Sequence, residues 1–185
     1  MKKLIVAAVG IAMAIVTNAA QIKWTCADGI ANATEEDWTS ATMVYLVNAA
    51  DITASDIYTA VQGGATLDSV VAAKAVASFD DATSISSTFN YGYTADTKQN
   101  LYMVCFDSDM NALYFSEQIE KTILGTGATK YGFTANSSME AAMADMSTFD
   151  ASVGGWVSTA AVPEPTSGLL LLLGMAGLAL KRKQA

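Results

Sequence analysis

The chain has 185 residues, no histidine and a net charge of −8 at pH 7, and its single arginine is Arg182. The lack of histidine excludes Ser-His-Asp and Cys-His catalysis and histidine-ligated metal sites. The acidic balance argues against nucleic acid as a partner. We therefore expect a protein that is not an enzyme and needs no cofactor.

The N-terminus has the layout of a secretory signal peptide. Lys2 and Lys3 precede an apolar run over residues 4–16, and residues 17–20 supply small side chains. Cleavage after Ala19 or Ala20 fits this pattern, and we take residues 1–20 as the signal peptide. The protein is then exported, and Gln21 begins the mature chain.

Residues 21–162 have the length of a single extracytoplasmic domain. Five lysines oppose seventeen acids there, which gives the domain a net charge of −12. The segments 21–27 and 41–47 are expected to be strands, the second one apolar on both faces. The linker between them carries Glu35, Glu36 and Asp37, which are predicted to be solvated loop acids rather than catalytic carboxylates.

Two helices are predicted next. Thr53 and Asp56 have the spacing of a capping box, and Gly63 with Gly64 would end that helix. Apolar residues then recur at helical spacing over 67–75. We expect this pair of helices to pack across one face of a sheet.

The second half of the domain is predicted to be rich in strands. Segments 89–93, 101–106 and 112–116 are separated by short turns and predict an antiparallel meander. Segments 122–124 and 131–134 suggest a further hairpin, and 138–146 a third helix. The expected fold is α+β: a mainly antiparallel sheet with a layer of two to three helices. A β-sandwich with a helical insertion is the alternative.

Cys26 and Cys105 are the only cysteines, an even number in a chain predicted to be exported. A disulfide between them would close a loop of about 80 residues and contribute roughly 2–4 kcal/mol. The alternative is two buried free thiols that act as small apolar side chains. We favour the disulfide because export leads to an oxidising compartment.

Two further patterns suggest ligands. Asp107, Asp109 and Asn111 resemble the opening of a calcium loop, but Ala112 and Gln118 replace the glycine and glutamate that such a loop needs, so a polar turn is favoured. Aromatic side chains could also form a sugar-stacking platform, although strand aromatics are more often core. The platform candidates are Trp38, Tyr91, Tyr93, Tyr102, Tyr114 and Trp156.

The C-terminal 24 residues are arranged as a short polar motif, an apolar run and a basic end. The motif is Val162, Pro163, Glu164 and Pro165, and the apolar run covers 168–180. The basic end consists of Lys181, Arg182 and Lys183. The apolar run is short for a membrane span, and the basic residues are expected on the cytoplasmic side.

This tail resembles the PEP-CTERM sorting signal of Gram-negative bacteria. The resemblance covers residues 162–185 and implies an exosortase-type sorting enzyme as partner, with cleavage near Pro163. The resemblance also implies that the protein comes from a bacterium that makes exopolysaccharide or biofilm. Before processing, residues 168–180 would hold the chain in the inner membrane, and residues 163–185 form the sorting segment.

We therefore expect an exported structural or interaction protein of the cell surface or extracellular matrix. It would be sorted through its tail and have no enzymatic activity. A module that binds extracellular polysaccharide is the alternative.

Overall fold

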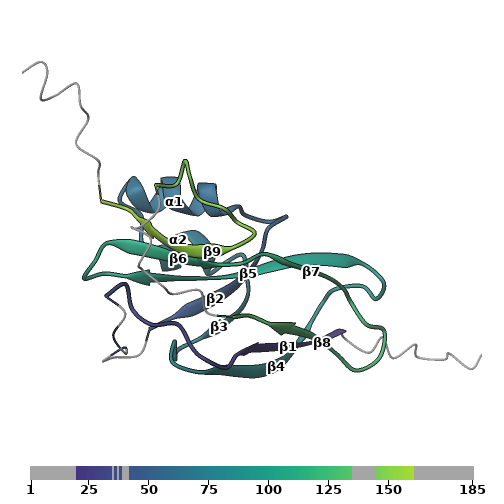
Figure 1. Ribbon diagram of the computed structural model, residues 1–185. Helices are drawn as coiled ribbons and strands as arrows, with labels where there is room; N and C mark the ends of the chain where they lie inside the picture. The colour runs from purple at the N-terminus through teal and green to yellow at the C-terminus, as the bar shows by residue number, and fades with distance from the viewer. Residues whose placement is uncertain (1–19, 35, 37, 39–41, 135–144, 161–185) are drawn as a thin grey trace, which may run out of the picture.

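The structure is a computed structural model that describes residues 20–34, 36, 38, 42–134 and 145–160. Within these residues the chain forms nine strands in two sheets and two short helices (Figure 1). The predicted third helix over 138–146 lies almost wholly outside the described residues.

The smaller sheet has three strands in the order β4-β1-β8. Its strands are β1 (Ala20–Cys26), β4 (Ile85–Tyr91) and β8 (Ala128–Gly132). The central strand β1 pairs antiparallel with β4 and parallel with β8. It alternates strictly between buried and more exposed side chains, as a strand with one face on the core must.

The larger sheet has the order β3-β2-β5-β6-β9, and β7 pairs with the first part of the long strand β5. All its pairings are antiparallel. Its strands are β2 (Val44–Asn48), β3 (Ala75–Phe79), β5 (Lys98–Asp107), β6 (Ala112–Ser116), β7 (Ile119–Thr122) and β9 (Gly154–Ser158). Strands β2 and β6 are buried along their whole length, because both of their faces are covered.

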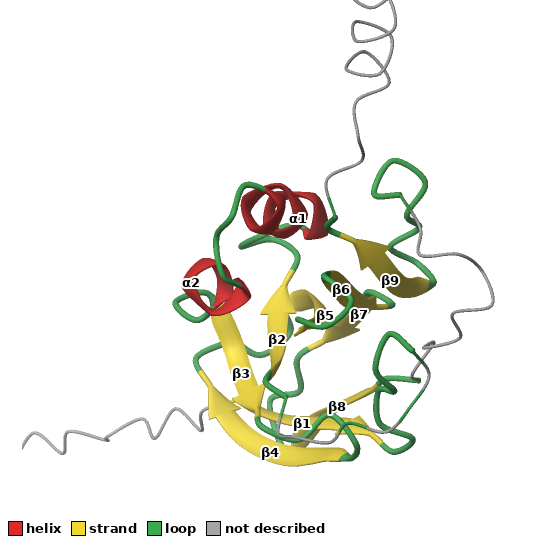
Figure 2. Ribbon diagram, turned by 90° about the vertical axis from the view of Figure 1, so that its left-hand side faces the viewer, coloured by secondary structure: helices red, strands yellow, loops and turns green. Residues whose placement is uncertain are grey.

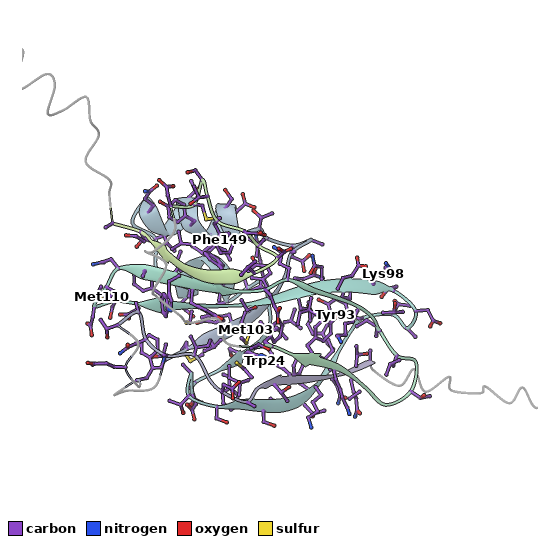
Figure 3. All side chains as sticks on the ribbon, viewed as in Figure 1. Trp24, Tyr93, Lys98, Met103, Met110 and Phe149 are labelled. Carbon is purple, nitrogen blue, oxygen red and sulfur yellow. The ribbon has the colours of Figure 1, made fainter. Side chains whose placement is uncertain are left out.

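The two sheets pack face to face, and the main core lies between them. Trp24 of β1 and Met103 of β5 are fully buried in this layer (Figure 3). The opposite face of the larger sheet carries a second apolar cluster, which includes Phe115 and the partly buried Phe149 at a ring-centroid distance of 5.4 Å.

The helices α1 (Ala54–Gln62) and α2 (Leu67–Val71) lie over this second cluster (Figures 1 and 2). The predicted capping box is confirmed: Asp56 N–H donates to Thr53 Oγ1 at 3.2 Å, and Thr53 N–H donates to Asp56 Oδ2 at 3.2 Å. The helix ends at Gly63 and Gly64, as predicted.

The predicted α+β fold with a layer of two to three helices is wrong. The described chain is mainly strand, and its helices have only nine and five residues. The helix predicted over 67–75 ends at Val71. The following residues form β3 from Ala75 onward, which pairs with β2 at the edge of the larger sheet. The two packed sheets are closer to the β-sandwich given as the alternative.

Two predicted strand pairings are also wrong. β5 and β6 form the expected hairpin. Residues 89–91 of the predicted strand 89–93, however, belong to β4 of the smaller sheet and do not pair with β5. The expected hairpin of 122–124 with 131–134 is absent, because β7 pairs with β5 and β8 pairs with β1. Short strands take the partner that buries their apolar face, and adjacency in sequence does not decide it.

Candidate functional site

The described residues form an open cleft of about 440 Å³ where four separate chain segments meet. These segments are the linker after β1, the residues leading into β2, the start of α2 and the turn between β5 and β6. The lining residues are Asn32, Trp38, Thr42, Met43, Tyr45, Leu67, Asp68, Phe106, Asp107, Ser108 and Asp109. The cleft thus combines aromatic and thioether surface with hydrogen-bonding groups.

Asp107 shapes one wall of this cleft. Its carboxylate is buried and accepts three backbone N–H groups: from Asp109 at 2.9 Å and Met110 at 3.2 Å on Oδ1, and from Ala33 at 2.9 Å on Oδ2. The first two bonds form the turn, and the third ties the linker to the larger sheet. Both oxygens are therefore engaged in structure.

This geometry favours the polar turn over the calcium loop. Asn111 adopts a left-handed conformation with φ of 49°, which asparagine tolerates in turns. Within the described residues no group of three or more cysteine, aspartate and glutamate side chains is placed to hold a metal ion.

Trp38 also lines the cleft. Its indole Nε1–H donates to the carbonyl oxygen of Ile30 at 2.7 Å, and its ring lies 6.4 Å from that of the buried Trp156. One edge of Trp38 is thus fixed, while the side chain remains only partly buried. Beside it, Met43 is 42% exposed. A fixed, accessible indole is a suitable surface for stacking a ligand ring.

Tyr45 and Asp68 contribute a hydrogen-bonded pair to the lining of the cleft. The Tyr45 hydroxyl donates to Asp68 Oδ1 at 2.5 Å. Burial and this bond together raise the pKa of Tyr45 to about 12. The phenol therefore stays protonated at neutral pH and holds the Asp68 carboxylate in place, which leaves carboxylate lone pairs available to a ligand hydroxyl.

The six aromatic candidates do not form one platform, and the favoured interpretation of strand aromatics as core residues holds for three of them. Tyr102, Tyr114 and Trp156 are buried in the two apolar clusters. Tyr91 and Tyr93 form a separate pair with ring centroids 4.2 Å apart, and Trp38 alone reaches the cleft. Tyr91 in β4 and Tyr102 in β5 belong to different sheets.

The two cysteines are free and buried in the structure, so the predicted disulfide is not formed in it. Both side chains belong to the core between the sheets, Cys26 from β1 and Cys105 from β5. Burial, with a smaller effect of the charge on Asp28, raises the pKa of Cys26 to about 11. Burial also raises the pKa of Cys105, helped by the nearby Asp107. Protonated buried thiols are poor nucleophiles.

The remaining sequence candidates contribute little to a site. Glu35 and Asp37 lie outside the described residues, and Glu36 is exposed in a turn that the Asn32 side chain closes by accepting the Glu36 N–H at 2.8 Å. Sequence reasoning missed most of the cleft, because its residues come from four distant segments with no common spacing. The sequence pattern around Tyr45 and Phe106 predicts buried strands and contains no signal for a cleft.

The comparisons with known proteins identify the tail and nothing else. Residues 161–183 match the PEP-CTERM protein-sorting motif, which confirms the resemblance seen in the tail. No curated protein and no solved structure matches the chain. The sorting motif and the 168–180 run lie outside the described residues, among which no helix is long and apolar enough to cross a membrane. The motif indicates a protein that exosortase sorts to the cell surface.

Proposed function

We propose that this protein is a non-enzymatic interaction protein of the cell surface. Its C-terminal tail directs it there, and exosortase processes that tail. The observation that carries this proposal is the match of residues 161–183 to the sorting motif directly behind the folded domain. Thr159 is still fastened to the domain, since its N–H and its hydroxyl both donate to the carbonyl oxygen of Asn111, at 2.8 and 2.7 Å. Only three residues separate Thr159 from Pro163.

This short spacing has a consequence for sorting. Four residue steps, from the Cα of Thr159 to the Cα of Pro163, span at most about 14 Å when fully extended. The turn that contains Asn111 is therefore close to the processed bond when the enzyme acts. Acidic side chains such as Asp109 keep this surface strongly hydrated, which suits a domain that is released into or held at an aqueous surface.

A pair of variants in the native host tests the proposal. The first lacks residues 163–185, and the second is an unrelated exported protein that carries residues 161–185 at its C-terminus. We expect the truncated domain to lose its surface location and the fusion to gain it. Surface delivery of the truncated domain, or failure of the tail to redirect the fusion, would contradict the role assigned to the tail.

The cleft supports a second candidate function, the binding of neutral carbohydrate. Its specific support is the combination of the partly exposed Trp38 ring with the oriented carboxylate of Asp68. Sugar rings present apolar C–H faces and hydroxyl groups, so such a site needs both kinds of surface.

Tryptophan fluorescence tests this candidate directly. The chain has three tryptophans, and Trp24 and Trp156 are buried, so ligand-dependent changes report on Trp38. We expect neutral oligosaccharides to shift the emission and to protect it from acrylamide quenching. A panel of such sugars that leaves the emission unchanged at millimolar concentration would remove this candidate.

A further inference from the structure

The outer face of the smaller sheet differs in charge from the rest of the domain. On each of its three strands the side chains that alternate with core residues point away from the larger sheet, and no described element covers them (Figures 1 and 2). The residues of this outer face are Gln21, Lys23, Thr25, Ser86, Thr88, Asn90, Ala128, Lys130 and Gly132. None of them is acidic, although the domain carries seventeen acids.

Two of the five lysines of the domain lie side by side on this face. Lys23 is the register partner of Lys130 across the β1–β8 pair and of Thr88 across the β1–β4 pair. Adjacent strands are about 4.8 Å apart, so the two ammonium groups repel each other. Within the described part of the chain the one salt bridge joins Lys98 to Glu120, and neither lysine of the pair has an acidic partner.

The same face leads into a pocket at the end of the sheet. This pocket has a volume of about 430 Å³ and is lined by Ala20, Gln21, Asn90 and the loop of residues 124–127. Gln21 and Asn90 are register partners one strand repeat, about 6.8 Å, from Lys23 and Thr88. When the signal peptide is removed, the new α-ammonium group lies on Ala20 or Gln21, and both line the pocket. Maturation thus adds a third positive charge beside the lysine pair.

The chemistry of the outer face selects among partners. It has no large apolar side chain that could form the buried centre of a protein–protein interface. A nucleic acid needs a far more basic surface. The partner that fits this face is a thin polymer with widely spaced carboxylates and many hydroxyl groups. Its carboxylates would contact the two lysines, and its hydroxyl groups would contact Thr88, Asn90 and Gln21.

We propose that the outer face of the smaller sheet, with the pocket at its end, binds an acidic polysaccharide built from uronic acid units. Lys23 and Lys130 bracket one carboxylate, and the hydroxyl and amide side chains along β1 and β4 bond the sugar hydroxyls. The neighbouring unit extends into the pocket toward Gln21, Asn90 and the mature amino terminus. This inference rests on the proposed function only in requiring export, and it names the partner class.

The test uses the mature protein, purified from the surface fraction, and oligomers of galacturonic acid as the probe. An unbranched neutral glucan of equal length serves as the comparison ligand. Isothermal titration is run at about 20 mM and about 300 mM salt. We expect binding of the acidic oligomer that weakens with salt, because the contacts are exposed ion pairs. We expect the glucan to give no salt-dependent heat, because any binding of a neutral sugar in the Trp38 cleft involves no ion pair.

A matched pair of double variants locates the site. Lys23→Gln with Lys130→Gln should weaken binding about tenfold, whereas Lys74→Gln with Lys121→Gln makes the same change in net charge elsewhere and should have no effect. The first variant should also keep or raise the melting temperature, because it removes a like-charge pair.

Four results would overturn the inference. They are absence of binding by the unmodified protein, equal losses in both double variants, a lower melting temperature on loss of the lysine pair, and lysine-dependent self-association in sedimentation experiments without oligomer binding. Correct surface delivery with no oligomer binding would remove this inference and leave the proposed function intact.

Discussion

The carboxylate of Asp107 offers a quantitative test of the structure around the cleft. In Asp107→Ala the buried N–H of Ala33, which is 1% exposed, loses its acceptor. An unsatisfied buried N–H costs about 1–3 kcal/mol. The N–H groups of Asp109 and Met110 lose their bonds as well, but they lie in a more exposed turn where water replaces the acceptor, at about 0.5–1 kcal/mol each.

The expected loss in the free energy of unfolding is therefore about 3 kcal/mol. Asp107→Asn should cost about half as much, because its amide oxygen can still accept both turn N–H groups while its NH₂ group faces Ala33 N–H. Asp109→Ala is the matched control: this side chain is exposed, and the change should stay within about 0.5 kcal/mol.

Urea unfolding followed by tryptophan fluorescence measures all three variants. The midpoint should fall in the order Asp109→Ala, Asp107→Asn, Asp107→Ala, at an unchanged dependence on urea. Acrylamide quenching of Trp38 in the folded state should rise in Asp107→Ala, because the linker that carries this ring loses its tie to β5. Equal stability of the two alanine variants would refute the reasoning.

Three further predictions follow from single residues. Because the pKa of Cys26 is raised in the fold, the unfolded thiol ionises first, so stability should fall between about pH 9 and pH 11; Cys26→Ala should remove the part of this slope that Cys26 contributes, while the raised pKa values of Cys105 and Tyr45 keep the remainder. Gly29→Ala should cost more than about 3 kcal/mol by urea unfolding, because φ is +68° and a Cβ would lie 2.1 Å from Thr83 O, whereas Gly64→Ala, with φ of +96° and open space, should cost about 1 kcal/mol. Ala20 is 6% exposed within β1, which favours cleavage after Ala19 over the boundary after Ala20 taken from the sequence; mass spectrometry of the mature protein should then show Ala20 as its first residue, and a start at Gln21 would contradict this prediction.

Local signals in the sequence were sufficient to place several elements. The pair Thr53 and Asp56 predicted the start of α1 because a capping box depends only on neighbouring residues. The apolar segment 101–106 and the turn at Asp107 predicted the β5–β6 hairpin for the same reason. In each case the interactions that decide the structure join residues a few positions apart.

Partners distant in sequence were not predictable in this way. β1 pairs with β4 and β8, whose residues lie about 60–70 and more than 100 positions further along the chain, and the buried side chains of β1, such as Ile22 and Trp24, favour that arrangement. The cleft and the lysine face depend on these pairings. Lys23 and Lys130 are unremarkable in the sequence and become neighbours only through the parallel register of β1 with β8.

The most direct test of the central claim is the C-terminal peptide of the protein recovered from the surface of native cells. Mass spectrometry should find a chain that ends close to Pro163 and lacks the basic residues Lys181, Arg182 and Lys183. A surface protein that retains these residues, or an intact chain confined to the inner membrane, would contradict sorting and processing through the tail.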